Sequence, residues 1–436
     1  MAKTTSIHTK PFLFLRDKSP FIAAAAASLL LLSALCSLII NSVPSTPTPT
    51  PTAATARGGC ASTTTDSPDT TFYDDPTLIY SIGSPLKNWD EKRQNWLHLH
   101  HHPSAAGAGV LNRVVVVTGS QPPPCENPAG DHLLLRLFKN KADYCRIQGH
   151  AIFYNNAFLH RKMTSVWAKL PPVRAAMVAH PEAEWVLWLD SDAVVTDMEF
   201  KLPLQEKYGN HNFVINGWED MIYEKRSWLG LNTGIFLIRN CQWSVDFIES
   251  WASLGPAGPN HEEVREIIRG ALTDKEFPGD EQSALVYLML KEKEKWGEKV
   301  YIENEYSFSG YWVGIVDGYE KIAERYRAVE AAAADGGLRR RHGEAVSGWY
   351  GEMREVYLKG TRDGNGGWRR PFITHFTGCQ PCSGHHDPSY GHESCWKGME
   401  RALNFADNQV IRNYGFVHDS LGNSSFVSPL QFDSPA

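Results

Sequence analysis

Tryptophan is missing from the first 88 residues, although the chain of 436 residues contains 14 tryptophans, all between Trp89 and Trp396. An excess of basic residues is also missing, because 43 Lys and Arg stand against 49 Asp and Glu and give a net charge of -6. This balance argues against a general nucleic-acid binder. With 42% hydrophobic and 21% charged residues, the chain is not wholly disordered. It therefore divides into a tryptophan-free beginning and a body large enough to bury a core.

Charge is absent from the apolar run Phe21–Ile40. Twenty helical residues span roughly 30 Å, the thickness of a bilayer's hydrocarbon core. The basic residues before the run are Lys3, Lys10, Arg16 and Lys18. They predict a cytosolic tail, residues 1–20, and a single membrane span, residues 21–40. A cleaved signal peptide is the alternative, but its apolar region usually has only about 7–15 residues, so we favour an uncleaved signal anchor.

Residues 41–71 are rich in Pro, Ser and Thr and contain almost nothing to bury, which predicts an extended stem. Anchor, stem and a lumenal domain over residues 72–436 form a type II layout, typical of Golgi or endoplasmic-reticulum enzymes but shared with receptors and lectins. One N-glycosylation sequon begins at Asn423, in keeping with a lumenal location.

Outside the predicted span, the cysteines are Cys60, Cys125, Cys145, Cys241, Cys379, Cys382 and Cys395. Seven is an odd number, so at least one is free or pairs between chains. The Cys379–Cys382 spacing has no second CxxC to complete a zinc site, and an oxidising lumen favours disulfides. Cys395 is therefore a candidate partner for one of these two cysteines.

The body has the pattern of an α/β domain. Apolar strands are predicted at Val114–Val117, Ala151–Tyr154, Trp185–Leu189, Phe213–Ile215, Ile235–Ile238 and Thr374–Phe376. Helical spacing is found at Leu133–Arg146, Ser165–His180, Asp246–Trp251, His261–Leu272 and Glu281–Leu290. Strands that alternate with helices predict a mostly parallel sheet covered on both faces, resembling a nucleotide-binding half-domain.

The most informative polar residues, Asp190 and Asp192, come directly after the apolar strand Trp185–Leu189. Ligands of parallel α/β sheets collect at the carboxyl ends of strands, and carboxylates at i and i+2 of an extended chain point to one side. Such a pair can chelate Mg or Mn with positions left for phosphate oxygens. The alternative is that Asp192 caps a following helix. We favour the metal site.

Other polar residues lie near predicted strands and helices. His375, between apolar neighbours on a short strand, is the candidate third metal ligand, although such a histidine is more often a core residue. Asn232 precedes a strand, and Asp280 and Gln282 open a helix where a carboxylate also acts as a cap. The histidines His98, His100, His101 and His102 precede the first core strand, and we expect them in an exposed linker. The aromatics Trp218, Trp228, Tyr306 and Trp312 either stack on sugar rings or fill the core.

Four long motifs in fixed order resemble plant Golgi glycosyltransferases of family 34: WLDSDAVVTDMEFKLPL, LNTGIFLIRNCQWS, FITHFTGCQPC and ERALNFADNQV. The resemblance implies a GT-A-like, Rossmann-like fold, a UDP-sugar donor and Mn2+ as cofactor. It also implies transfer to a β-1,4-linked backbone with formation of an α-1,6 branch. It would place the metal on Asp190, Asp192 and His375. Around UDP it would place Thr118, Gly119, Ser191, Gly378 and Gln380. It would also place Asn232, Asp280 and Gln282 where they face the donor sugar and the acceptor.

Two positions depart from the xylosyltransferase pattern of this family. Gln380 stands where those enzymes typically have a phosphate-binding lysine, and Glu281 stands where Asp is usual. The first departure resembles the galactosyl branch. We therefore expect a retaining galactomannan 6-α-galactosyltransferase of the Golgi membrane, which takes UDP-galactose as donor and a β-1,4-mannan as acceptor. We expect mannan synthase or other glycosyltransferases as protein partners, and we expect no binding of nucleic acid. The alternatives are a UDP-xylose-dependent xyloglucan 6-xylosyltransferase and a non-catalytic Golgi scaffold.

Overall fold

The computed structural model describes residues 78–100, 113–274, 279–332, 347–364, 367–391 and 393–430. They belong to a compact unit formed by Asp69–Ala436. The expected span and stem, residues 21–40 and 41–71, lie outside the described residues. Among the helices of the described part, none is long and apolar enough to cross a membrane.

A six-stranded sheet forms the centre of the domain, in the order β2-β1-β3-β6-β5-β7. Its strands are β1 (Val114–Gly119), β2 (Ala151–Asn155), β3 (Trp185–Leu189), β5 (Phe213–Gly217), β6 (Leu231–Arg239) and β7 (Val300–Glu303). The pairs β1/β2, β1/β3 and β5/β7 are parallel, whereas β6 runs antiparallel to both β3 and β5. The predicted, mostly parallel sheet is confirmed, with β6 as the reversed strand.

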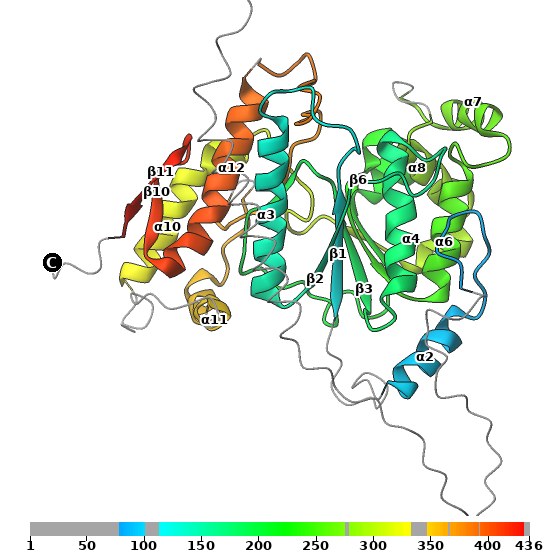
Figure 1. The fold of residues 1–436 in the computed structure, drawn as a ribbon, viewed down its shortest axis with the longest axis horizontal. Coiled ribbons are helices and arrows are strands. Elements are labelled where there is room, and N and C mark those ends of the chain that lie inside the picture. The colour runs from blue at the N-terminus through cyan, green and yellow to red at the C-terminus, as the bar shows by residue number, and fades with distance from the viewer. Residues whose placement is uncertain are drawn as a thin grey trace, which may run out of the picture. The chain divides into compact units, whose positions relative to one another are not determined.

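Helices lie on both sides of this sheet, as Figure 1 shows. On one side are α3 (Gly130–Gln148), α10 (Tyr319–Ala332) and α12 (Ser394–Ile411), and on the other are α4 (Leu170–Ala179), α6 (Gln242–Ser253) and α8 (Glu281–Lys291). Shorter or more peripheral helices are α2 (Trp89–Leu99), α5 (Glu219–Tyr223), α7 (His261–Ala271), α9 (Lys293–Trp296) and α11 (Ser347–Leu358). The 3-10 turns are η3 (Ser165–Lys169), η4 (Trp228–Gly230), η5 (Gly297–Lys299), η6 (Val316–Gly318) and η9 (Arg412–Tyr414).

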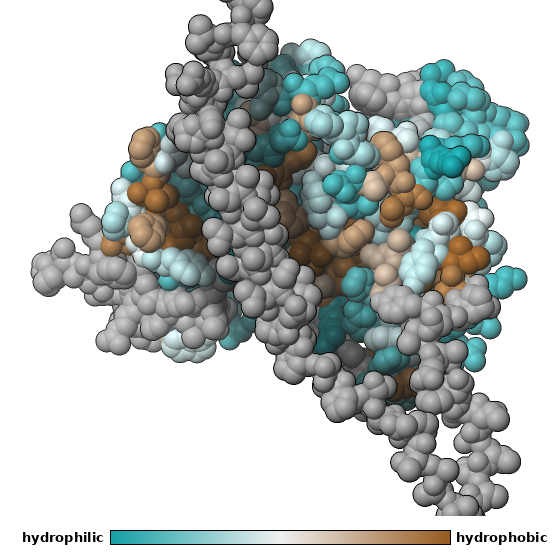
Figure 2. All heavy atoms as spheres, viewed as in Figure 1, coloured by the Kyte–Doolittle hydropathy of each residue, from teal (hydrophilic) through white to brown (hydrophobic). Residues whose placement is uncertain are grey.

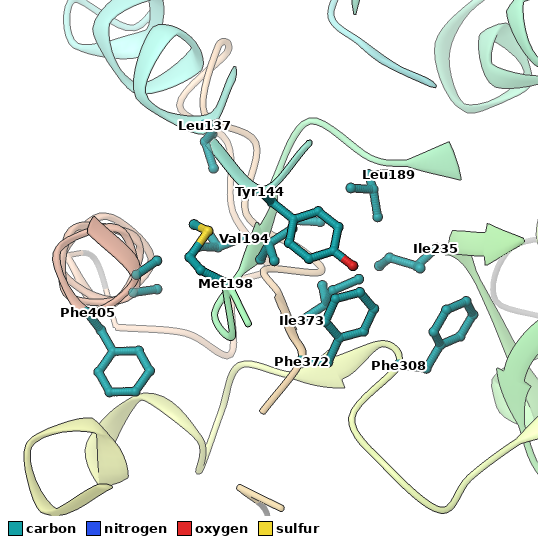
Figure 3. Packing of buried hydrophobic residues seen from close by; sticks show 14 of the residues in the cluster. Leu137, Tyr144, Leu189, Val194, Met198, Ile235, Phe308, Phe372, Ile373 and Phe405 are labelled. Atoms are coloured by element: carbon teal, nitrogen blue, oxygen red, sulfur yellow. The ribbon is translucent and has the colours of Figure 1, made fainter. Parts of the chain in front are cut away.

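Side chains that point alternately to the two faces of the sheet form two hydrophobic cores. On β3, Trp185, Leu187 and Leu189 belong to the core beneath α3 and α12, whereas Val186 and Trp188 belong to the core beneath α4, α6 and α8. Successive side chains of a strand point to opposite faces, so a wholly apolar strand serves both cores. Figure 3 shows the first core, where Tyr144 of α3 packs against Phe372 at a centroid distance of 5.6 Å.

A second, three-stranded sheet has the order β4-β9-β8 and lies next to the carboxyl end of β3. It consists of β4 (Ala193–Val195), β8 (Gly310–Tyr311) and β9 (Ile373–His375). The C-terminal hairpin, β10 (Phe416–Ser420) and β11 (Asn423–Pro429), packs against α12. The small sheet matters for function because it brings residues 190–195 beside residues 373–375.

Two expectations about local structure need correction. His98 and His100 are exposed, as expected, but His98 lies within α2 and His100 is its C-cap, so they do not belong to a linker. His101 and His102 lie outside the described residues. A polar helix can form here because its buried side packs through Trp89 and Leu97. The predicted helix Ser165–His180 is divided into η3 and α4, because α4 begins with prolines at its first turn. Helix α7 was predicted correctly, and the face of it that Figure 2 shows is mostly hydrophilic.

Candidate functional site

Two aspartates and a histidine meet at the carboxyl end of β3. Asp190 follows β3 directly, and Asp192 precedes β4, whose Ala193 is paired in register with His375 of β9. The His375 Nε2 atom lies 3.3 Å from Asp192 Oδ1 and 4.0 Å from Asp190 Oδ2. One ligand atom from each residue fits within a 4.8 Å limit on their mutual distances. The structure therefore brings together the three residues that were predicted as metal ligands.

The donor set suits a divalent cation. Two carboxylates and one imidazole are ligands that Mn2+ and similar ions accept, and three protein ligands leave positions for phosphate oxygens or water. The alternative role of Asp192 as a helix cap is wrong, because the segment that follows it is strand β4 and not a helix. The pair is therefore available to bind a ligand.

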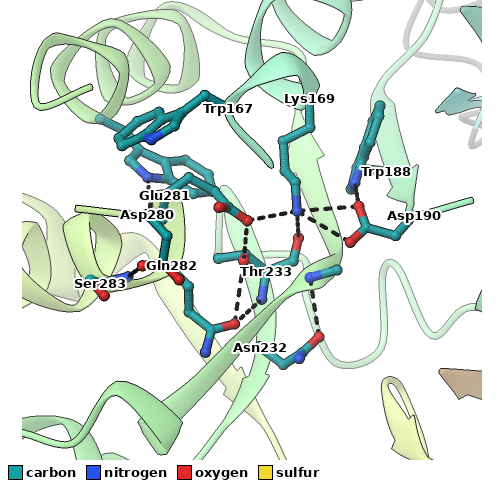
Figure 4. A network of polar contacts seen from close by, with 12 residues as sticks. Trp167, Lys169, Trp188, Asp190, Asn232, Thr233, Asp280, Glu281, Gln282 and Ser283 are labelled. Atoms are coloured by element: carbon teal, nitrogen blue, oxygen red, sulfur yellow. Dashed lines mark hydrogen bonds and ion pairs between the residues drawn. The ribbon is translucent and has the colours of Figure 1, made fainter. Parts of the chain in front are cut away.

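Asp190 is held in place from behind, as Figure 4 shows. The indole Nε1 of Trp188 donates to Asp190 Oδ1 over 2.6 Å, and Lys169 Nζ lies 3.2 Å from the same oxygen. Lys169 also contacts Glu281 Oε1 at 2.7 Å, and both side chains of this pair are about 95% buried (5% and 4% exposed). Burial alone would lower the pKa of Lys169, but the carboxylates of Asp190 and Glu281 raise it above its ordinary value.

A second buried lysine supports the loop between the two aspartates. Lys141 of α3 donates to the carbonyl oxygens of Ser191 (3.2 Å) and Ala193 (2.8 Å). Burial lowers the pKa of Lys141 to about 8, although the nearby charges of Asp192 and Asp190 act in the opposite direction. Sequence reasoning missed both lysines. For Lys141 a signal existed, because it shares the buried stripe of α3 with Leu137 and Tyr144, where a lysine is unusual.

A cavity of about 320 Å³ opens beside the aspartates. Of the five residues expected around UDP, Gly119, Ser191 and Gln380 line it, together with Lys169 and both aspartates. Thr118 is buried just behind Gly119, and its Oγ1 has no hydrogen-bond partner among the described residues. Gly378 has φ +78°, a left-handed conformation that favours glycine, and lies on the loop that leads into the cavity wall. The cavity volume of about 320 Å³ is in the range of small-molecule binding sites.

Two disulfides hold the cavity wall that contains Gln380. Cys379 is bonded to Cys395 of α12, which confirms Cys395 as a partner of the CxxC pair, and Cys382 is bonded to Cys125. Cys145 and Cys241 are free, while Cys60 lies outside the described residues. Since Cys379, Gln380 and Cys382 all line the cavity, the two cross-links fix the backbone on both sides of Gln380.

The residues expected to face the sugars have partners within the protein. Asp280 is the N-cap of α8, with Oδ1 accepting from the Ser283 N–H (2.7 Å) and Oδ2 accepting from Trp228 Nε1 (2.8 Å). The capping role considered from the sequence is thus present, and α8 begins at Glu281. Burial, aided by the charge of Glu281, raises the pKa of Asp280. The amide of Gln282 bonds Thr233 N–H at one end and the Trp228 carbonyl at the other.

Asn232 is directed toward the metal cluster. Its Oδ1 lies 3.1 Å from His375 Nδ1 and accepts hydrogen bonds from the Gly234 N–H (3.1 Å) and Ser309 Oγ (3.0 Å). Gly234 is needed for this approach, because a Cβ there would lie 2.0 Å from His375 Cε1. Ser309 is a further residue that sequence reasoning missed, and no motif pointed to it.

Burial separates the four aromatic candidates. Trp312 is only 7% exposed and belongs to the core, and Tyr306 packs against that core with its hydroxyl 2.7 Å from Tyr208. Trp228 is held by Asp280. Trp218 is 48% exposed and follows β5, with its N–H bonded to the Gly230 carbonyl next to β6. Of the four, Trp218 is the most exposed and is therefore the candidate for contact with a sugar ring. The sequon residue Asn423 is also exposed, at the start of β11.

Comparisons with known proteins give a family match, sequence relatives and more distant structural neighbours. Residues 111–386 match the model of the galactosyl transferase GMA12/MNN10 family. The chain is 53% identical to galactomannan galactosyltransferase 1 of Cyamopsis tetragonoloba, over 97% of this chain and 98% of that one. It is 45% identical to a probable xyloglucan 6-xylosyltransferase 1 of Oryza sativa subsp. indica, over 79% and 68% of the two chains. A crystal structure of a glycosyltransferase involved in the glycosylation of the major capsid of PBCV-1 matches at 14% identity and a TM-score of 0.32, over 48% of this chain and 88% of that one.

Proposed function

Because the chain belongs to the galactosyl transferase GMA12/MNN10 family, we propose that it is a galactomannan 6-α-galactosyltransferase. It transfers galactose from UDP-galactose to O6 of mannose in a β-1,4-mannan, with retention of configuration. The observation that carries the proposal is the cluster of Asp190, Asp192 and His375, whose two aspartates line a cavity of about 320 Å³. The choice of sugars follows the relative from Cyamopsis tetragonoloba, which the chain matches over almost its whole length.

The proposed donor site uses the described residues as follows. Asp190, Asp192 and His375 hold a divalent cation, Mn2+, which supplies Lewis-acid stabilisation of the diphosphate leaving group. Gly119, Ser191 and Gln380 line the space for UDP, and the disulfides on either side of Gln380 keep that wall in place before the donor arrives. A preorganised wall reduces the entropy cost of binding. This is the arrangement expected of a GT-A-like domain.

Retention of configuration leaves two routes for the transfer. In a two-step route a carboxylate forms a covalent intermediate, and Asp280 is the candidate that we test first. Both of its oxygens accept hydrogen bonds, from Ser283 and Trp228, so its orientation is fixed but its electron pairs are partly engaged. In the other route the acceptor attacks from the same face as the leaving UDP. Trapping of a glycosylated Asp280, with loss of the adduct in Asp280→Asn, would select the first route.

The proposed enzyme is a single-pass type II protein of the Golgi membrane, with residues 1–20 cytosolic, 21–40 spanning, 41–71 as stem and 72–436 lumenal. This proposal is supported by the uncharged run Phe21–Ile40 and by the exposed sequon at Asn423. Protease protection of Golgi vesicles, combined with glycosidase treatment, tests it. Digestion of the catalytic part in intact vesicles would contradict a lumenal orientation.

The deciding experiment is a donor-by-acceptor assay on the purified full-length chain in detergent. UDP-galactose and UDP-xylose are each offered with mannan and cellulose oligosaccharides, with and without Mn2+. We expect galactose transfer to manno-oligosaccharide, dependent on the metal and lost in Asp192→Asn. Predominant xylose transfer to cello-oligosaccharide would favour the alternative, a xyloglucan 6-xylosyltransferase. This alternative is retained because the chain is 45% identical to the rice relative of that name. No transfer and no release of UDP would favour the Golgi scaffold.

A further inference from the structure

The amide oxygen of Asn232 lies within hydrogen-bond distance of three polar groups. The backbone N–H of Gly234 donates to it over 3.1 Å, the hydroxyl of Ser309 donates over 3.0 Å, and the Nδ1 atom of His375 lies 3.1 Å away. Ser309 Oγ is itself 3.3 Å from His375 Nδ1. Asn232 belongs to β6, Ser309 to the turn before β8, and His375 to β9. Their contacts therefore join the large sheet to the small one.

The Gly234 N–H determines which way the Asn232 amide faces. A backbone N–H is always a donor, so the atom of Asn232 that faces it must be the oxygen and not the NH2 group. The same oxygen faces His375 Nδ1, and an amide oxygen can only accept. Nδ1 must therefore carry the proton. Ser309, whose hydrogen is directed to Asn232, presents an oxygen to that same Nδ1–H.

The consequence appears at the other ring nitrogen of His375. With the proton on Nδ1, a neutral imidazole presents the lone pair of Nε2 to Asp192 Oδ1 at 3.3 Å and to Asp190 Oδ2 at 4.0 Å. A lone pair among carboxylate oxygens is unfavourable by itself and becomes favourable when a cation lies between them. Hydrogen bonding of the second ring nitrogen is how proteins orient metal-bound histidines.

We propose that Asn232 and Ser309 are positioning residues that fix His375 in the Nδ1–H form, so that Nε2 binds the divalent cation. This inference rests on the proposed metal-dependent function. It assigns Ser309 a role, and it moves Asn232 from contact with the sugars to support of the metal site. Gly234 completes the arrangement, because its missing side chain leaves room for the His375 ring.

The test is the affinity of the full-length chain for Mn2+ alone, measured by calorimetry and by the electron paramagnetic resonance signal of free Mn2+. Loss of a hydrogen-bond partner behind a ligating histidine typically weakens metal binding about 10–100-fold, and we expect this for Asn232→Ala. Ser309→Ala should weaken binding less, because the Asn232 contact remains. Asn232→Asp should retain affinity, since its carboxylate can accept from both Gly234 and His375.

The matched control is Asn216→Ala. Asn216, on the neighbouring strand β5, is paired in register with Asn232, but its amide donates to the Glu303 carbonyl (2.9 Å) and makes no hydrogen bond to His375. This variant should lose stability and retain Mn2+ affinity. In protein labelled with 15N-histidine, the signal that disappears in His375→Gln should show the proton on Nδ1, and Asn232→Ala should change that signal.

The outcomes separate this inference from the proposed function. If the unmodified chain does not bind Mn2+, the metal-dependent function itself fails. If it binds Mn2+ and the folded Asn232→Ala and Ser309→Ala variants bind equally well, the positioning role is overturned. The role is supported when Asn232→Ala and Ser309→Ala weaken binding and Asn232→Asp restores it. A proton found on Nε2 of His375 would also overturn it.

Discussion

The buried pair of Lys169 and Glu281 allows a quantitative prediction. Both side chains are about 95% buried, their charged atoms are 2.7 Å apart, and Glu281 also accepts from Thr233 Oγ1 at 2.8 Å. Removing Lys169 leaves the buried carboxylate of Glu281 without its cation, and an uncompensated buried charge typically costs about 3–5 kcal/mol. We therefore expect Lys169→Met to lower the free energy of unfolding by that amount. With an unfolding entropy of about 2.1 cal/mol/K per residue over roughly 350 residues, the melting temperature should fall by about 4–7 °C.

Replacing both partners should cost no more than replacing one. In Lys169→Met/Glu281→Leu no uncompensated charge remains within the pair, and apolar replacements of a buried ion pair are often neutral or stabilising. Since the double variant should cost no more than Lys169→Met, the coupling energy from the double-mutant cycle should be at least as large as the cost of Glu281→Leu alone. The control is Lys201→Met, which breaks the pair with Glu352, whose two side chains are 60% and 65% exposed. That loss should stay below about 1 kcal/mol.

Tryptophan fluorescence during thermal unfolding is a suitable assay, because all 14 tryptophans lie between Trp89 and Trp396 and report on the globular part of the chain. If Lys169→Met costs no more than Lys201→Met, the buried pair does not stabilise the fold as argued. If the losses of unfolding free energy in the two single variants add up to the loss in the double variant, Lys169 and Glu281 act independently, and the reasoning is equally refuted.

Three further predictions concern separate parts of the domain. Gly234→Ala should displace the His375 ring and weaken Mn2+ binding, since the new Cβ would lie 2.0 Å from Cε1; unchanged affinity in calorimetry would contradict this. Trp218→Ala should raise the acceptor KM about tenfold, which equals about 1.4 kcal/mol, while donor hydrolysis stays the same, and an unchanged KM would place the acceptor elsewhere. Burial lowers the pKa of His150 to about 4, so between about pH 6.5 and 4 the unfolded chain takes up a proton that the folded one does not. Stability on the order of 3 kcal/mol should be lost as the pH falls through this window. The unfolding free energy of the original chain minus that of His150→Gln, measured in urea at each pH, should therefore fall by about this amount; a difference that stays constant with pH would refute it.

Much of the fold was accessible from local pattern. The strands around Val114–Val117 and Trp185–Leu189 were predicted because a short, wholly apolar, β-branched or aromatic run is characteristic of a strand buried on both faces. The reversed direction of β6 was not, because LNTGIFLIR has the same composition whether it runs parallel or antiparallel to its neighbours. Helix α2 was missed because its sequence is mostly polar and its helical form depends on packing of Trp89 and Leu97.

The sequence by itself determined that this chain belongs to a glycosyltransferase family and that two aspartates follow a buried strand, because motifs and strand ends are local features of the chain. It also pointed to His375 as their companion. Only the tertiary structure decided what surrounds them. Lys169, Glu281 and Ser309 reach the site from different elements, and Ser309 lies 77 residues from Asn232 along the chain. Contacts over such separations depend on strand order and helix packing, and no short pattern of residues encodes them.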